Sequence, residues 1–176
     1  MSGFKTDKVT DMSYMFAGCT ALTNLNVNTF NTRQVKCMEG MFASCSGLTS
    51  LDLSGFNTVK VWHMFEMFSS CDNLRTIFVG DDWVTTEVNS SFRMFNLCKK
   101  LVGGAGTTYD VSHIDVTYAR IDGGPASDTP GYFTRSGEEP YKEPEAYAVL
   151  SESNTKLTFY YNNNITSDGM GVGTFS

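Results

Sequence analysis

A repeat of 26 residues runs through the first hundred residues of this sequence and restricts what the chain can fold into. The dipeptide Met-Phe occurs four times in one register, at spacings of 26, 26 and 27 residues, and each of these four copies is followed three residues later by a cysteine. The copies are Met15-Phe16, Met41-Phe42, Met67-Phe68 and Met94-Phe95, with Cys19, Cys45, Cys71 and Cys98. A unit this short cannot bury its own apolar face, so neighbouring units must stack to form a core.

Other positions repeat in the same register. They are Leu22, Leu48, Leu74 and Leu101; Val9, Val35, Val61 and Val88; Phe4, Phe30, Phe56 and Trp83; and Thr6, Thr32, Thr58 and Thr85. The one extra residue falls at Gly80-Asp81-Asp82, where the earlier units have a two-residue link. Because the apolar columns are undisturbed, this insertion is expected in a surface turn.

Within each unit the apolar spacing changes from helical to extended. Residues 12–19 carry apolar side chains at i, i+3, i+4 and i+7, which predicts a short helix. Leu25 and Val27 alternate with polar neighbours, which predicts a brief strand. The fold class expected is an α/β repeat solenoid of right-handed coils, with a parallel β-sheet on one face, short helices on the other and a C-terminal β-hairpin.

Two columns predict specific contacts between units. The aromatic column of Phe30, Phe56 and Trp83 is expected to form a buried spine with rings in contact from one unit to the next. The threonine column offers a hydroxyl to each unit, and each hydroxyl is expected to bond a backbone group of the adjacent turn.

Residues 48–58, followed by Val61, Met64, Met67-Phe68 and Cys71, resemble the BspA-type leucine-rich repeat, a 26-residue repeat of bacterial surface proteins that also occurs in repeat families of the Mycoplasma-lipoprotein type. The resemblance covers residues 1 to about 101, and the glycine-rich stretch after it is similar to the tail of such arrays. It implies a secreted or surface-displayed interaction module with no catalytic residues, and it specifies no ligand.

The chain divides by composition into four parts. They are four repeats over 1–101, a capping segment over 102–134, a linker over 135–145, and a β-hairpin over 146–176 that starts a following module. Met1-Ser-Gly-Phe4 aligns with Leu53-Ser-Gly-Phe56, so further repeats are expected upstream and the sequence is interpreted as an excerpt of a longer protein.

Charge and hydropathy exclude some partners. Thirteen Lys and Arg against nineteen Asp and Glu give a net charge of −6, which argues against binding nucleic acid. No apolar run is long enough to cross a bilayer, so no membrane insertion is expected in this segment. With the resemblance, the expected location is the bacterial cell surface or the extracellular space, the signal and anchor lying outside this segment.

Metal and redox chemistry have little support in the spacing of possible ligands. The two histidines and five cysteines lack any CxxC or HExxH pattern, so no metal or cofactor is expected. The cysteine column is interpreted as buried thiols without disulfides, and Cys37 is the only thiol expected to be exposed. His63 shares its column with Asp11, Cys37 and Ser90, a set too mixed for metal ligands. Asp81-Asp82 with Asp52 remains a minor alternative for a hard cation.

The outward positions of the predicted strands form the candidate partner-binding face. They are Asn24, Asn26, Asn28, Ser50, Asp52, Ser54, Thr76 and Phe78. Phe78 is the one large apolar residue among them, and it is either a binding anchor or a side chain that packs under the inserted loop or the C-terminal cap.

Three functions remain open. The leading one is a non-catalytic interaction or adhesion module whose sheet face binds a macromolecular partner, either a protein or a glycan of a host or neighbouring cell. The alternative is a structural spacer or stalk of a larger surface protein. The third is an enzyme with a site near His113 and Asp115, which the weak spacing of that pair makes the least favoured.

Overall fold

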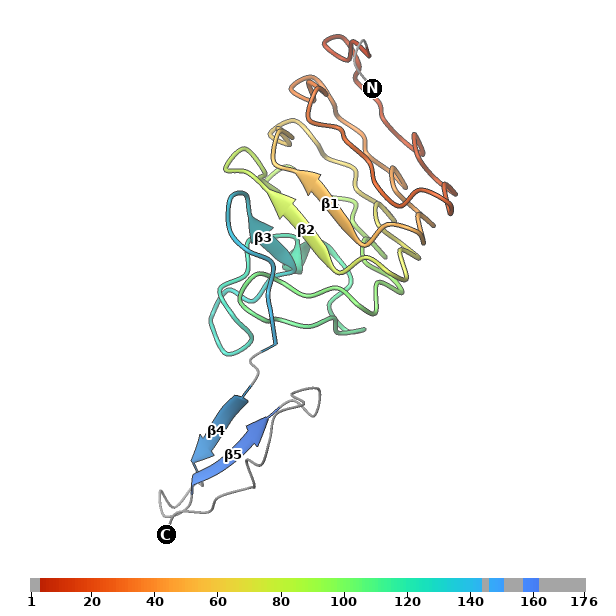
Figure 1. The fold of residues 1–176 in the computed structure, drawn as a ribbon. Helices are drawn as coiled ribbons and strands as arrows, with labels where there is room; N and C mark the ends of the chain where they lie inside the picture. The colour runs from red at the N-terminus through yellow and green to blue at the C-terminus, as the bar shows by residue number, and fades with distance from the viewer. Residues whose placement is uncertain (1–3, 144–145, 151–156, 162–176) are drawn as a thin grey trace. The chain divides into compact units, whose positions relative to one another are not determined.

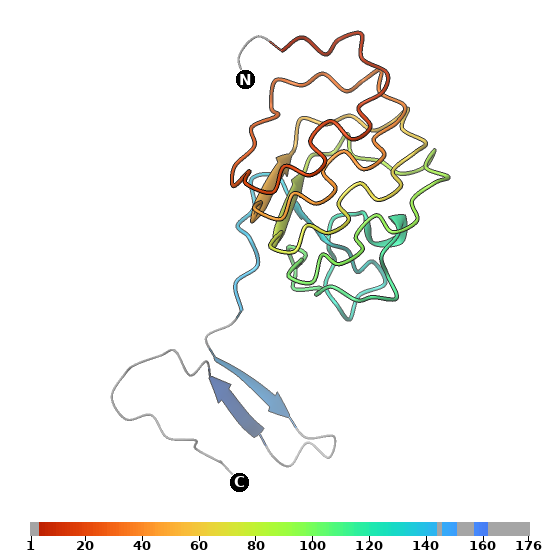
Figure 2. The same cartoon turned by 90° about the vertical axis from the view of Figure 1, so that its right-hand side faces the viewer.

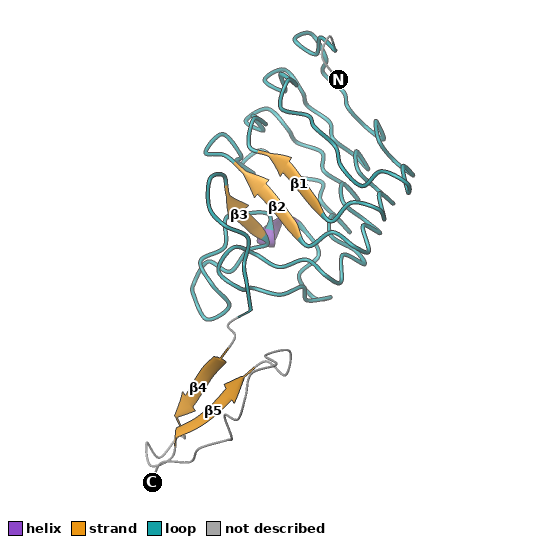
Figure 3. Cartoon of the chain, viewed as in Figure 1, coloured by secondary structure: helices purple, strands orange, loops and turns teal. Residues whose placement is uncertain are grey.

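A computed structural model describes residues 4–143, 146–150 and 157–161, and the chain divides into two compact units, Met1–Tyr141 and Lys142–Ser176 (Figure 1). The elements in order are β1 (Ser50–Leu53), β2 (Thr76–Val79), the 3-10 helix η1 (Val116–Tyr118), β3 (Phe133–Arg135), β4 (Ala146–Leu150) and β5 (Leu157–Tyr161). Most of the first unit consists of turns and loops around a small sheet (Figure 3).

The sheet of the first unit pairs residues that are one repeat apart. Strand β1 lies parallel to β2, with Ser50 opposite Thr76 and Leu53 opposite Val79. The pairing step is therefore the 26-residue period of the sequence, and we call each 26-residue unit a coil. Figure 2 shows the coils side by side, from red at the N-terminal end to green. Leu25 and Val27 of the first coil are buried but form no strand.

The third strand comes from the C-terminal part of the unit. Strand β3 lies parallel to β2, with Ile77 opposite Phe133 and Phe78 opposite Thr134. Arg135, which the composition assigns to the linker, is the last residue of β3 and pairs with Asp81. The sheet that the coils begin is thus continued by a strand whose residues lie outside the repeat.

The sequence pattern predicts short helices on the other face, but residues 12–19 and their equivalents form tight turns. Alternate backbone N–H groups donate to the next coil, from Met12 to the Cys37 carbonyl (2.9 Å), from Tyr14 to Glu39 (2.8 Å) and from Phe16 to Met41 (2.9 Å). An α-helix would need the same N–H groups for bonds to residue i−4. The bonds between coils therefore replace the helix.

Left-handed residues recur at one position of these turns and prevent a helix from propagating. Tyr14, Gly40, Glu66 and Arg93 have φ of 56°, 54°, 52° and 58°. A residue other than glycine adopts this backbone conformation at a cost in free energy, and the hydrogen bonds between coils offset that cost. At Gly40 an added Cβ would lie 2.4 Å from the ring of Tyr14, so the tyrosine occupies the space that glycine leaves.

The core consists of the repeated apolar columns, but the continuous ring stack is not the predicted one. Phe16, Phe42, Phe68 and Phe95 stack in order with centroids 5.7, 5.7 and 5.5 Å apart and rings within 7° of parallel. Phe30, Phe56 and Trp83 are buried as expected, and Trp83 meets Phe133 edge-on at 5.1 Å.

The first three threonines of the column, Thr6, Thr32 and Thr58, behave as predicted. The Thr32 hydroxyl donates to the Asn57 carbonyl (2.9 Å) and accepts from the Asn57 N–H (2.8 Å), and Thr6 and Thr58 make the same pair of bonds. The hydroxyls satisfy backbone groups of the next coil in a buried column.

The cysteine side chains are hydrogen-bonded to the backbone of the phenylalanine column. The thiols of Cys45, Cys71 and Cys98 each donate to the carbonyl of the phenylalanine one coil earlier, at 3.0 to 3.1 Å. Burial raises the pKa of Cys71 to about 12 and raises that of Cys98 well above its usual value. Cys19, in the first described coil, is exposed, so the expectation that Cys37 is the only exposed thiol is wrong.

A buried carboxylate organises the C-terminal segment. Asp122 accepts hydrogen bonds from the backbone of Ala105, Thr107, Gly124 and Gly131 and from the Thr107 hydroxyl. Burial alone would raise the pKa of Asp122, but these donors outweigh it and leave the pKa below its usual value. This network links residues 105–107 to the loop that precedes β3.

In the second unit, β4 and β5 pair antiparallel, from Ala146 opposite Tyr161 to Leu150 opposite Leu157. The remaining residues of the hairpin module predicted over 146–176 lie outside the described residues. No helix in the described part of the chain is long and apolar enough to cross a membrane.

Candidate functional site

The eight predicted sheet-face residues differ in exposure. Asn24, Asn26, Asn28 and Ser50 are exposed, whereas Asp52, Ser54 and Phe78 are half-buried. Thr76 is only 6% exposed, so the structure removes it from any binding face. The exposed part of this face consists of small polar side chains from the first coils.

Two of these side chains accept a hydrogen bond from the backbone N–H group two residues further along the chain. The Asn26 side chain accepts from the Asn28 N–H (3.0 Å), and the Asp52 carboxylate accepts from the Ser54 N–H (2.9 Å). Such bonds end a strand in a turn. Phe78 lies opposite Thr134 of β3, so the C-terminal segment flanks it and the packing alternative accounts for its half-buried state.

The pair His113 and Asp115 does not form a dyad. The Asp115 carboxylate accepts from the Thr117 N–H (2.9 Å) and caps η1. The Nδ1 atom of His113 lies 3.4 Å from Asp110 and 3.1 Å from the Ser112 hydroxyl. A catalytic triad needs the two ring nitrogens to face different partners, but both contacts here are made to Nδ1.

A surface hollow of about 530 Å³ lies nearby and is lined by Tyr109, Asp110, Tyr118 and Pro130 among others. His113 contacts Tyr118, with ring centroids 4.3 Å apart, but it is not among the lining residues. The geometry around His113 therefore provides no support for the enzyme alternative.

The acidic loop does not assemble as a cation site. Asp81 pairs with Arg135, and Asp82 accepts from the Asn57 side chain at 3.1 Å. Asp52 caps its own turn. Each carboxylate has a separate partner, so the hard-cation alternative is not supported.

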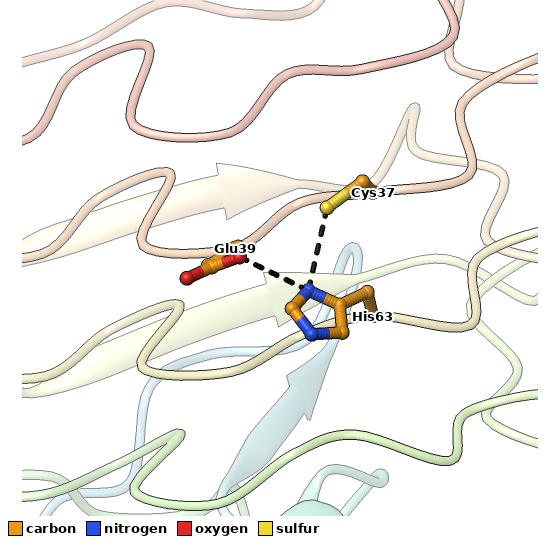
Figure 4. A group of neighbouring side chains, drawn as sticks. All are labelled: Cys37, Glu39 and His63. Carbon is orange, nitrogen blue, oxygen red and sulfur yellow. Dashed lines mark hydrogen bonds and ion pairs between the residues drawn. The ribbon is translucent and has the colours of Figure 1, made fainter.

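The structure does bring together Cys37, Glu39 and His63 (Figure 4). The His63 Nδ1 atom lies 3.4 Å from the Cys37 sulfur and 3.3 Å from a Glu39 carboxylate oxygen. All three side chains are half-buried, and one ligand atom of each lies within 4.8 Å of the others. Cys37 and Glu39 come from one coil and His63 comes from the next, and all three lie at or just before the start of a turn segment.

Other side chains hold these three in place. The Ser13 hydroxyl lies 2.9 Å from the Cys37 sulfur, and the Tyr14 hydroxyl donates to Glu39. The Trp62 ring lies 5.2 Å from the His63 ring. The hydrogen bond to Glu39 raises the pKa of Tyr14 to about 12.

The column of Asp11, Cys37, His63 and Ser90 predicted from the repeat is present, as a chain of parallel bridges. Sequence reasoning rejected it as a ligand set because it compared residues within one column only. Glu39 belongs to the column two positions further on, and residues i and i+2 of an extended segment share a face. A search across neighbouring columns would have found it.

Comparison with known proteins adds one match. The model of the family described as "Mycoplasma protein of unknown function, DUF285" matches residues 1–113, which include all four Met-Phe repeats. No curated protein and no solved structure matches the sequence.

Proposed function

This chain belongs to the family described as Mycoplasma protein of unknown function, and we propose that it is a non-catalytic interaction module that binds a protein partner outside the bacterial cell. The repeat resembles the BspA type of surface proteins, and this resemblance supports the location. The match to the family, which carries no stated activity, leaves the function to be inferred from the surface.

The proposed scaffold is a right-handed solenoid without the helices. Parallel pairing of residues 26 apart in β1 and β2 supports it, because a connection between neighbouring parallel strands is almost always right-handed. A repeat scaffold keeps its core columns constant while the outward columns vary, and it thus separates stability from recognition.

Exposed aromatic side chains on and beside the turn segments carry the proposal. Tyr14, Trp62 and Phe92 are 52%, 45% and 61% exposed. We call the outward side chains of residues 13–14, 39–40, 65–66 and 92–93, together with Trp62, the turn face. Protein interfaces are enriched in aromatic residues and arginine, and a few such residues supply most of the binding free energy.

The charges on the turn face suit a protein partner. The Arg93 guanidinium lies 5.2 Å from the centre of the Phe92 ring and 3.7 Å from the Glu66 carboxylate. Phe92 also contacts Phe65, with ring centroids 6.2 Å apart. Aromatic rings beside both charge signs form a mixed surface, whereas the exposed sheet-face residues are small and uncharged. We therefore place the main contact on the turn face instead of the sheet face.

The test uses the full chain, labelled and applied to arrays of purified extracellular-matrix and cell-surface proteins, with a glycan array in parallel. For any protein that binds, we compare the variant Trp62→Ala/Phe92→Ala with the sheet-face variant Asn24→Ala/Ser50→Ala. The Trp62→Ala/Phe92→Ala variant is expected to weaken binding at least about 30-fold, since the loss of a single aromatic anchor costs about 2 kcal/mol or more. The sheet-face variant is expected to bind like the parent chain.

Three outcomes would contradict the proposal. Binding to glycans alone would indicate a lectin-like module. Loss of binding only in the sheet-face variant would place the contact on the face that the strand pattern indicates. Failure to bind any protein on the arrays would favour the structural spacer.

A further inference from the structure

We propose that Cys37, Glu39 and His63 bind one divalent metal ion of the zinc class; Glu39 also lies on the turn face, but the argument for the metal does not rest on the proposed protein-binding function. The cluster is the one group among the described residues in which three potential ligands of this kind converge. It combines a sulfur, an imidazole nitrogen and a carboxylate oxygen, the three donor types that proteins use for Zn²⁺. A thiolate and a carboxylate together balance the two positive charges of the ion.

The spacing of the donor atoms fits a single ion. Tetrahedral zinc, with bonds of about 2.0 to 2.3 Å, places its ligand atoms roughly 3.3 to 3.6 Å apart. The Nδ1 atom of His63 is 3.4 Å from the Cys37 sulfur and 3.3 Å from the Glu39 oxygen. The Glu39 oxygen and the Cys37 sulfur lie within 4.8 Å of each other, so this pair of atoms is the one that has to approach when the ion binds.

The backbone holds the ligands in register before any ion binds. Met38, between Cys37 and Glu39, is fully buried, so the two ligands lie on the outward side of the segment. The Met38 N–H donates to the His63 carbonyl at 2.9 Å, and Cys37 and His63 form a parallel bridge. Two adjacent coils are thereby locked together at the cluster.

The neighbours of the ligands supply outer support. Ser13 contacts the sulfur and the Tyr14 hydroxyl donates to Glu39, the kind of contact that orients metal ligands in proteins. Water completes the fourth position, because the side chains of His63 and Glu39 remain 21% and 27% exposed. Binding replaces the thiol proton of Cys37 with a sulfur–metal bond and releases that proton to solvent.

The other cysteines show why this thiol is the ligand. Cys45, Cys71 and Cys98 are buried and donate to backbone carbonyls. Cys19 is exposed but does not belong to the converging group. Cys19 is therefore the matched control for Cys37, and His113 is the control for His63.

The experiment is titration of the full chain, without an affinity tag, with ZnCl₂ by calorimetry and with CoCl₂ by absorbance, in chelator-treated buffer with a phosphine reductant. We expect one ion per chain and, with cobalt, a thiolate charge-transfer band together with the intense visible bands of tetrahedral geometry. Cys37→Ser and His63→Ala are expected to weaken zinc binding at least 100-fold, whereas Cys19→Ser and His113→Ala are expected to bind like the parent chain.

The proposal is overturned if the chain binds no zinc at micromolar concentrations. It is also overturned if Cys19→Ser or His113→Ala abolishes binding while Cys37→Ser does not. Because the ligand variants could also unfold the chain, each variant is checked by circular dichroism, and Glu39→Gln serves as a milder substitution. Glu39→Gln is expected to weaken binding at least 10-fold and to retain the thiolate band.

Discussion

The hydroxyl of Thr32 is bonded twice to Asn57, one coil away: it donates to the Asn57 carbonyl at 2.9 Å and accepts from the Asn57 N–H at 2.8 Å. Thr32 is 1% exposed, whereas Asn57 is half-buried, so the bonded hydroxyl lies inside the column and its partner lies at the edge of it. A single side chain thus satisfies both backbone groups of a residue in the next coil.

Thr32→Val keeps the size of the side chain and removes both bonds. We expect it to lower the free energy of unfolding by about 1 to 3 kcal/mol, because the backbone N–H and carbonyl of half-buried Asn57 both lose the hydroxyl that pairs with them. Urea unfolding of the full chain measures the change. The control is Thr49→Val at an exposed position, expected to change stability by less than about 0.5 kcal/mol. Equal effects of the two substitutions would show that the two hydrogen bonds between Thr32 and Asn57 do not stabilise the coils.

Phe68→Ala interrupts the ring stack between Phe42 and Phe95. We expect a loss of about 3 to 5 kcal/mol, as for other fully buried phenylalanines, with the same measurement. Phe56→Ala is expected to cost as much, since its burial is equivalent. Phe92→Ala is the exposed control and should cost less than about 0.5 kcal/mol. A cost under 1 kcal/mol at Phe68 would show that neighbouring side chains fill the space.

The buried thiols predict a loss of stability in alkali. Burial raises the pKa of Cys71 from 9.0 to about 12, so the unfolded chain releases this proton at a lower pH than the folded chain. The contribution is complete below pH 9 and is lost as the pH rises towards 12. Because the pKa values of Tyr14 and Tyr132 are also raised to about 12, the parent chain must be compared with a variant.

The comparison variant is Cys71→Ala. Its free energy of unfolding, measured in urea from pH 7 to pH 11, should fall less steeply above pH 9 than that of the parent chain. At neutral pH the variant is less stable than the parent chain because of the cavity, so the slopes are compared and not the absolute values. Identical slopes would mean that the Cys71 thiol ionises at the same pH in both states.

Trypsin should distinguish Arg135 from Lys142. Arg135 belongs to β3 and pairs with Asp81, and the next residue donates its N–H to the Val79 carbonyl at 2.9 Å. Lys142 is exposed and begins the second compact unit. We expect the first cleavage after Lys142 and accumulation of a fragment ending there, detected by mass spectrometry. Cleavage first at Arg135 would support a linker that starts at residue 135, as the composition suggests.

The sequence by itself determined the period, the columns and which columns form the core. Identical residues at a constant spacing can bury their apolar faces only against their equivalents in the next coil, so the 26-residue step appears again in the pairing of β1 with β2. The pair of hydrogen bonds made by the Thr32 hydroxyl also followed from the column, because a buried hydroxyl must find a hydrogen-bond partner.

Local pattern alone did not distinguish a helix from a turn over residues 12–19. The spacing of apolar residues fits both, and only the neighbouring coil decides, since its carbonyls accept the N–H groups that a helix would use. For the same reason the ring stack formed in the column of Phe16 instead of that of Phe30: which rings meet depends on the packing of coils, not on the spacing within one coil.

The tertiary structure alone decided two further features. Strand β3 joined the sheet although Phe133 lies outside the repeat, because an unpaired edge of β2 accepts any extended segment that the chain returns to it. Cys37, Glu39 and His63 converged because residues two apart share a face and residues 26 apart are adjacent. Neither relation is visible within a single column, and the distances between the ligand atoms depend on how closely the coils approach.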